Sequence, residues 1–149
     1  MKRQRYGIVT ILLALSISLI AVVCMLVLTF GKEDGSAKAE IVEKTENMVV
    51  IKVNETEGFA TLLDAMNYLK NERELTFEIV GGMISSIEGK SNPADFSSCW
   101  MLFTSDEEMS NAEWGTTTYN GNTYASAILG AESLTVSAGE YYVLEYVTF

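Results

Sequence analysis

Hydrophobic and polar positions divide this chain into two regions with different patterns. Residues 6–31 contain no charged side chain; three basic residues precede them, and Lys32-Glu33-Asp34 follow. A helix of about 25 residues at roughly 1.5 Å each spans about 37 Å, which crosses a hydrocarbon core of roughly 30 Å with some tilt. The pattern therefore predicts a transmembrane signal anchor over residues 6–31, preceded by a basic cytoplasmic end over residues 1–5.

The positive-inside rule orients this predicted anchor. The basic end stays in the cytoplasm and the acidic remainder lies outside, which predicts a single-pass protein of the cell membrane with an extracellular C-terminal domain. Two alternatives are a cleaved signal peptide, with Ala37-Lys38-Ala39 as its small-x-small site, and lipid attachment at Cys24. The apolar run is longer than the roughly 7 to 15 residues of a signal peptide, and Ala21-Val22-Val23 lacks a small residue next to the cysteine.

Residues 32–47 (KEDGSAKAEIVEKTEN) are charged and small, without an apolar period. Such a segment cannot bury enough apolar area to offset the entropy of ordering it, so we predict a flexible tether. The remaining residues, 48–149, are enough for one compact extracytoplasmic domain.

The first half of this domain predicts strands around one short helix. The β-branched run 48–53 is typical of a strand. Thr61 and Asp64 have the spacing of a capping box, and apolar residues recur at helical spacing over residues 62–70. Two further strands, 75–80 and 83–87, flank a turn at Gly81-Gly82.

The second half has mostly strand signals. Residues 116–119 and 123–127 flank Asn120-Gly121-Asn122, a strong hairpin signal because Asn and Gly tolerate positive φ. Further strands are predicted over 100–103, 134–136 and 141–147. The order of elements favours an α+β fold, specifically a β-grasp-like domain with one short helix packed on a mixed β-sheet. The aromatic residues expected mostly in its core are Trp100, Phe103, Tyr119, Tyr124, Tyr142 and Tyr146.

The acidic charge is concentrated after the apolar run. All 20 acidic residues and seven of the ten basic ones follow Gly31, so this part carries a net charge of −13. The charge argues against a nucleic-acid partner, which needs a basic surface, and is typical of a soluble exported domain. A calcium-stabilised surface at Asp106-Glu107-Glu108 is an alternative, although the spacing does not follow an EF-hand loop.

The residue types available restrict the chemistry. The chain contains no histidine, which excludes Ser-His-Asp and Cys-His catalysis and imidazole-ligated zinc sites. Its two cysteines are Cys24, inside the apolar run, and Cys99, which we expect to be buried. An enzyme that uses paired carboxylates is a third function class, but no two carboxylates stand out. We therefore predict no enzymatic activity, no catalytic residues, no metal and no catalytic cofactor.

Four short motifs occur in the order found in a bacterial surface module: Thr61-Leu62-Leu63-Asp64-Ala65-Met66, Ile84-Ser85-Ser86-Ile87-Glu88-Gly89, Cys99-Trp100-Met101-Leu102-Phe103 and Gly139-Glu140-Tyr141-Tyr142-Val143. On these motifs, residues 48–149 resemble the transcobalamin-like C-terminal domain family. This family recurs in exported proteins of Gram-positive bacteria and is similar to the cap domain of vertebrate cobalamin carriers. The resemblance implies a binding domain, with cobalamin as a ligand rather than a catalytic cofactor.

The chain departs from the family after the tryptophan strand. The family usually turns there through an Asn-Gly pair, whereas this chain continues into an acidic insertion that carries Trp114. A corrin ring would need a flat apolar wall, which Trp114, Tyr119 and Tyr124 could provide. Each residue also has a structural interpretation: Trp114 could pack onto its own domain, and the two tyrosines could form a cross-strand pair at the hairpin.

Together these features predict a membrane-tethered extracytoplasmic binding module for a corrinoid or another small ligand. The alternative is a cell-surface interaction or structural module that binds a protein or wall polymer, for instance by adding a strand at an open sheet edge.

Overall fold

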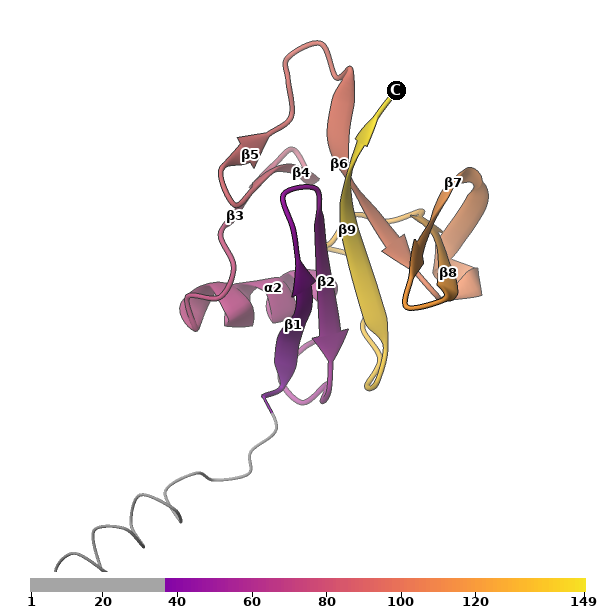
Figure 1. The fold of residues 1–149 in the computed structure, drawn as a ribbon. Helices are drawn as coiled ribbons and strands as arrows, with labels where there is room; N and C mark the ends of the chain where they lie inside the picture. Colours follow the sequence, from indigo (N-terminus) through magenta and orange to yellow (C-terminus); the bar gives the residue numbers. More distant parts are fainter. Residues whose placement is uncertain (1–36) are drawn as a thin grey trace, which may run out of the picture. The chain divides into compact units, whose positions relative to one another are not determined.

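The computed structural model describes residues 37–149. These residues form two antiparallel sheets and one α-helix (Figure 1). The six-stranded sheet has the order β1-β2-β9-β6-β8-β7, and the three-stranded sheet has the order β3-β4-β5. The elements are β1 (Ala39–Lys44), β2 (Met48–Val53), α2 (Leu62–Asn71), β3 (Phe77–Val80), β4 (Met83–Ile87), β5 (Lys90–Ser91), β6 (Ser98–Thr104), the 3₁₀ helix η1 (Glu107–Met109), β7 (Ser110–Tyr119), β8 (Asn122–Ala127) and β9 (Tyr141–Thr148).

The predicted α+β, β-grasp-like fold is wrong. The described part of the chain is 50% strand and 12% helix, and every pair of neighbouring strands in it is antiparallel, so it has no mixed sheet. Hairpins join four of the eight pairs of consecutive strands, which allows antiparallel pairing without crossover helices. No helix within residues 37–149 is both long and apolar enough to cross a membrane. The anchor predicted over residues 6–31 lies outside the described residues.

The predicted tether also differs from the structure. Ala39–Lys44 form strand β1, which pairs with β2, and residues 45–47 make the turn between them. Ala39 is buried against the core. The tether prediction is therefore wrong for residues 39–47, because one edge strand needs few apolar residues when only one of its faces meets the core.

Most of the other predicted elements are confirmed. Strand β2, helix α2, the β3–β4 hairpin, the β7–β8 hairpin and β9 all occur where the sequence pattern places them. Asn120 and Gly121 have positive φ angles of 48° and 78°, as the hairpin signal requires. The strand predicted over residues 134–136 is wrong: this segment forms only an isolated bridge from Thr135 to Thr61.

The main core lies between the larger sheet and the elements that cover one of its faces. Antiparallel partners share a face, so Leu102 and Leu144 point to the same side, together with alternate residues of β2. Helix α2 and the smaller sheet cover this side. The fully buried side chains of this core include Val49, Ile51, Val53, Leu62, Met66, Leu69, Leu75, Ile87, Leu134 and Leu144.

A second, smaller core lies on the opposite face of the larger sheet. Val50, Phe103, Tyr124 and Val143 are buried there. The ring of Tyr119 on β7 packs 5.9 Å from the ring of Tyr141 on β9, although two strands separate β7 from β9 in the sheet order. The β7–β8 hairpin must therefore fold over this face and cover it.

The start of helix α2 is fixed by two sets of hydrogen bonds. The Asp64 carboxylate accepts from the N–H groups of Ala60 (2.8 Å) and Thr61 (2.9 Å), as the predicted capping box requires. These bonds hold the pKa of Asp64 below its usual value. The next amides, of Leu62 and Leu63, donate to the C=O groups of Leu134 and Ala131. The segment after β8 is thereby attached to the helix.

Candidate functional site

The candidate site is a groove that opens where β8 separates from β6. Strand β6 pairs with β9 along Ser98–Thr104, but with β8 only at Phe103 and Thr104. After Ala127 the chain turns away from β6, and the Ile128 N–H donates to the C=O of Met109 at 3.0 Å. The space left between the two strands forms a groove of about 480 Å³. This volume is in the range of small-molecule and peptide side-chain pockets.

The groove has a buried apolar floor and an exposed apolar rim. Trp100 and Leu102 of β6 and Ile84 of β4 are buried in its floor. The rim consists of four side chains that remain exposed to solvent, at 58% for Trp114, 51% for Met83, 42% for Ile128 and 36% for Leu129. Exposed apolar side chains gathered around one hollow are typical of a binding surface, whereas single ones are ordinary.

Two glycines allow the wall of the groove to form. A Cβ atom placed on Gly130 would lie only 2.7 Å from the backbone oxygen of Gly82, in the β3–β4 turn. The segment 128–131 therefore packs backbone to backbone against that turn and closes one end of the groove. Gly130 then accepts hydrogen bonds from the amides of Ser133 and Leu134, both at 3.0 Å.

A bulge in β7 exposes Trp114. Asn111 pairs with Ser126, and the next pair along β7 is Thr116 with Ala125, so residues 112–115 have no partners on β8. Gly115, inside this bulge, has a φ of 126°, which other residues rarely adopt. The segment of the acidic insertion around Trp114 is therefore an irregular part of a strand, and strand bulges commonly redirect a side chain.

Hydrogen bonds fix Trp100 in the floor. Its indole N–H donates to the Lys90 C=O at 2.8 Å, and its backbone N–H donates to the Asn92 Oδ1 at 2.9 Å. The edge of its ring meets Tyr146, with ring centroids 5.4 Å apart. Trp100 is thus held by its backbone, by its indole N–H and by its ring contact, which gives the groove a preformed floor.

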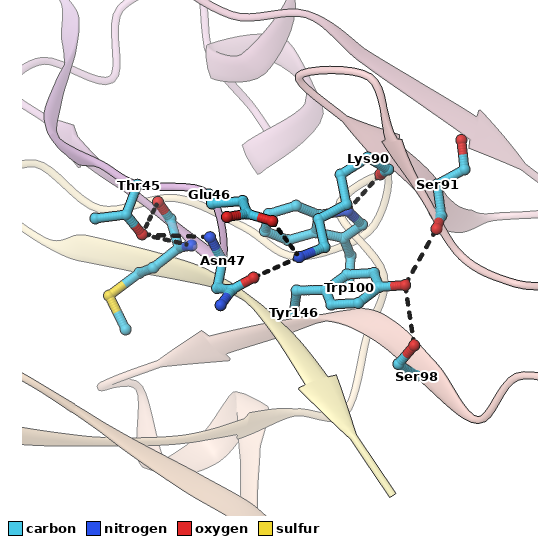
Figure 2. A network of polar contacts seen from close by, with 9 residues as sticks. Thr45, Glu46, Asn47, Lys90, Ser91, Ser98, Trp100 and Tyr146 are labelled. Atoms are coloured by element: carbon cyan, nitrogen blue, oxygen red, sulfur yellow. Dashed lines mark hydrogen bonds and ion pairs between the residues drawn. The ribbon is translucent and has the colours of Figure 1, made fainter.

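A polar network behind Trp100 joins the two sheets (Figure 2). The Lys90 Nζ lies 4.3 Å from the centroid of the Tyr146 ring, pairs with Glu46 at 3.6 Å and donates to the Asn47 Oδ1. The Tyr146 O–H donates to the Ser91 C=O at 3.1 Å and accepts from the Ser98 hydroxyl at 2.9 Å. A partly exposed ion pair contributes little to stability, so the main effect of the network is to position β5 and Trp100.

Ten of the 13 residues that line the groove belong to the stretch 91–149, and the other three are Gly82, Met83 and Ile84. Residues 91–149 contain eight acidic side chains and no lysine or arginine. Glu132 lies beside the groove wall: a Cβ on Gly82 would be 4.0 Å from its carboxylate oxygen. Lys90, which lies behind Trp100, is paired with Glu46, so the acidic excess of the stretch 91–149 favours positively charged ligands.

Of the three site residues predicted from the sequence, only Trp114 lines this groove. Tyr124 is buried, with 3% of its surface exposed, in the second core, and Tyr119 is half-buried beside Tyr141. Burial raises the pKa of both tyrosines. The structure thus separates Tyr119 and Tyr124 from Trp114. Tyr119 pairs with Asn122 and Tyr124 with Thr117, so the two tyrosines are not direct cross-strand partners, and both belong to the second core.

The other rim residues were not found from the sequence. Ile128 and Leu129 follow a strand and precede Gly130, so an apolar pair in a turn was the available signal. Met83 begins β4 and was counted only as a strand residue. Their convergence depends on the contact between the segment 128–131 and the β3–β4 turn, which links residues almost 50 positions apart.

The acidic run after β6 has a local structural explanation. The Asp106 carboxylate accepts from the Glu108 N–H at 2.9 Å and caps the short helix η1. Within residues 37–149, no three acidic or cysteine side chains come together as a metal site would require. Cys99 is half-buried rather than fully buried, and burial raises the pKa of its thiol.

Comparisons with protein-family models, curated proteins and solved structures returned no match. The resemblance to the transcobalamin-like family therefore stays a prediction from four short motifs.

Proposed function

We propose that this protein is a non-enzymatic, membrane-tethered extracytoplasmic binding module, and that the groove between β6 and β8 is its binding site. One observation carries the proposal: four exposed apolar side chains surround a hollow whose floor is apolar and preformed. A soluble domain gains nothing by exposing a tryptophan, a methionine, an isoleucine and a leucine together unless a ligand covers them.

The proposed location follows from the sequence. The uncharged run over residues 6–31 follows a basic end and precedes an acidic remainder, the pattern of a single-pass anchor with its C-terminal domain outside. Only seven residues, 32–38, separate this run from the first strand at Ala39. The tether we propose is therefore much shorter than the sequence pattern predicted.

The size of the rim sets the strength of binding expected from apolar contacts alone. Each 100 Å² of apolar surface that a ligand removes from water gains about 2.5 kcal/mol. Association itself costs at least about 4 kcal/mol. The rim alone therefore supports only weak binding, and polar contacts have to add affinity. A corrinoid presents both an apolar face and an amide rim, so it remains the first small ligand to test.

Two tryptophans with different environments make a direct assay. In the ¹⁵N-labelled full chain, held in non-ionic detergent micelles, the indole N–H of Trp114 reports on the groove rim. The indole of Trp100, bonded to the Lys90 C=O, reports on the intact fold. Titration with cobinamide, cobalamin and naphthol should shift the Trp114 signal in a saturable way. The signal is assigned by its disappearance in Trp114→Ala.

Two variants distinguish binding in the groove from nonspecific hydrophobic binding. The double variant Met83→Ser/Leu129→Ser removes apolar rim but keeps Trp114, and it should weaken binding at least tenfold. Phe149→Ala removes an exposed aromatic ring, 76% accessible, that does not line the groove, and it should bind like the natural chain. The absence of a saturable Trp114 shift with any of the three probes up to millimolar concentration would refute a small-ligand site in this groove, and the absence of a shift with the peptide probes described below as well would refute the proposed function.

A further inference from the structure

We infer that the natural occupant of the groove is an extended peptide segment with apolar and positively charged side chains, which pairs through its main chain with the open edge of β6. This inference rests on the proposed function and names the ligand class for the same site. Three observations support it: the direction in which the backbone groups of β6 point, the residues on either side of that strand and the charge around the groove.

The N–H and C=O groups of successive β6 residues point alternately toward β9 and toward the groove. The Phe149 N–H donates to the Ser97 C=O, so odd-numbered residues of this strand bond to β9. Polar groups alternate between the two edges of an antiparallel strand, so Trp100 and Leu102 direct their N–H and C=O groups away from β9. The bond from the Trp100 N–H to the Asn92 side chain confirms this direction.

No strand within the described residues pairs with this edge before Phe103. On this edge the Trp100 N–H already donates to the Asn92 side chain. The Trp100 C=O and the Leu102 N–H come next along the same edge. A carbonyl and an amide two residues apart on one edge can bind the N–H and C=O of a single residue in a parallel strand. This arrangement fits a peptide backbone.

The side chains along β6 show that the groove follows the strand edge rather than one face of the sheet. Trp100 and Leu102 belong to the main core, whereas Met101 points to the opposite face and packs against the second core. All three line the groove. A hollow bounded by both faces of one strand is shaped for an extended chain beside that strand, as in recognition by strand addition.

Charge complementarity determines the kind of peptide. The stretch 91–149 has eight acidic residues and no lysine or arginine, the neighbouring Lys90 is paired with Glu46, and Glu132 lies beside the groove wall. A peptide with alternating apolar and basic residues would place its apolar side chains on the rim and its positive charges near these carboxylates. An anionic lipid surface, the other occupant that apolar side chains suggest, would be repelled by the same charges.

The test uses the two indole signals and synthetic probes. Acetyl-Lys-Val-Lys-Val-Lys-Val-amide should shift the Trp114 signal of the full chain with a Kd at least tenfold lower than that of the peptide with glutamate in place of lysine. Glu132→Gln, beside the groove wall, should weaken binding of the lysine peptide twofold to fivefold, and Glu57→Gln, which changes an exposed acid in the loop before α2, should not. Equal binding of the two peptides would overturn the charge argument.

N-methylated peptides test the main-chain pairing without changing the protein. One lysine peptide carries N-methyl groups on its three valines and another on its three lysines, so each loses the donors along one edge. One of them should bind at least tenfold more weakly than the other, because only one edge faces β6. If both bind as tightly as the parent peptide, strand addition is wrong.

The outcomes separate the inference from the proposed function. If naphthol or cobinamide shifts Trp114 and the lysine peptide does not, the groove binds ligands but the peptide assignment fails. If neither the small probes nor the peptide shifts it, both proposals fail. Stronger Trp114 shifts with anionic lipid vesicles than with the peptide would also overturn the peptide assignment.

Discussion

Replacement of Gly130 by alanine tests the backbone contact that shapes the groove. The new Cβ would lie 2.7 Å from the backbone oxygen of Gly82, well inside contact distance. Neither atom belongs to a flexible side chain, so the segment 128–131 or the β3–β4 turn has to move. Gly130 does not have a positive φ, so the expected effect comes from the clash and not from a strained conformation of alanine.

The size of this effect is the difference between two terms. Overpacking of this kind costs about 1–3 kcal/mol. Replacing glycine by alanine at a position without conformational strain stabilises the fold by about 0.4–1 kcal/mol, because alanine lowers the conformational entropy of the unfolded chain. The net loss should be about 1–2 kcal/mol, which lowers the urea midpoint by about 0.5–1 M at a slope of about 2 kcal/mol per molar urea.

The assay is urea unfolding of the full chain, followed by Trp fluorescence at constant detergent concentration. Ser133→Ala, in the same turn but with an exposed side chain, is the matched control and should change the stability by less than about 0.5 kcal/mol. A Gly130→Ala midpoint equal to or above that of the natural chain would show that the two segments are not in contact, and the groove would then lack its end wall.

Three further predictions concern the core and the helix start. Leu134→Ala, at a fully buried position, should lower the free energy of unfolding by about 3–4 kcal/mol in the same urea assay, and a loss below about 1 kcal/mol would contradict its burial. Trp100→Phe leaves the Lys90 C=O without its indole donor and should lower the free energy of unfolding by about 1–3 kcal/mol. A negligible loss would contradict this and show that solvent reaches the carbonyl. The lowered pKa of Asp64 means that its bonds stabilise the fold above the unfolded pKa and lose this effect as the pH falls through the folded pKa. Asp64→Ala should therefore melt at a lower temperature than the natural chain at pH 7, with a gap that narrows as the pH falls to about 3; a constant gap would argue against the carboxylate bonds.

Local patterns in the sequence were sufficient where neighbouring residues decide the structure. The capping box at Thr61 and Asp64 and the Asn-Gly turn of the β7–β8 hairpin are short-range features, and both occur as predicted. The edge strand β1 was missed because its few apolar residues among charged ones resemble a tether when the partner strand is unknown. The α+β class was wrong for a related reason: the sequence shows strands, but not which strands pair or in which direction.

Trp114 could be selected from the sequence because a tryptophan in a polar, glycine-flanked segment is unusual. Its partners could not be selected. Met83, Ile128 and Leu129 are ordinary apolar residues in sequence, and they meet Trp114 only because β8 leaves β6 and Gly130 contacts Gly82. The same folding placed Tyr119 and Tyr124 over the second core and removed them from the site.

The sequence by itself determined the uncharged run, the excess of acidic residues, the absence of histidine and the local turns and helix cap. Each of these depends on residue type or on neighbours within a few positions. The tertiary structure alone decided the strand order, the two cores, the open edge of β6 and the composition of the groove. These features arise from contacts between residues far apart in the chain, where packing and backbone pairing select among many arrangements that the local pattern allows equally.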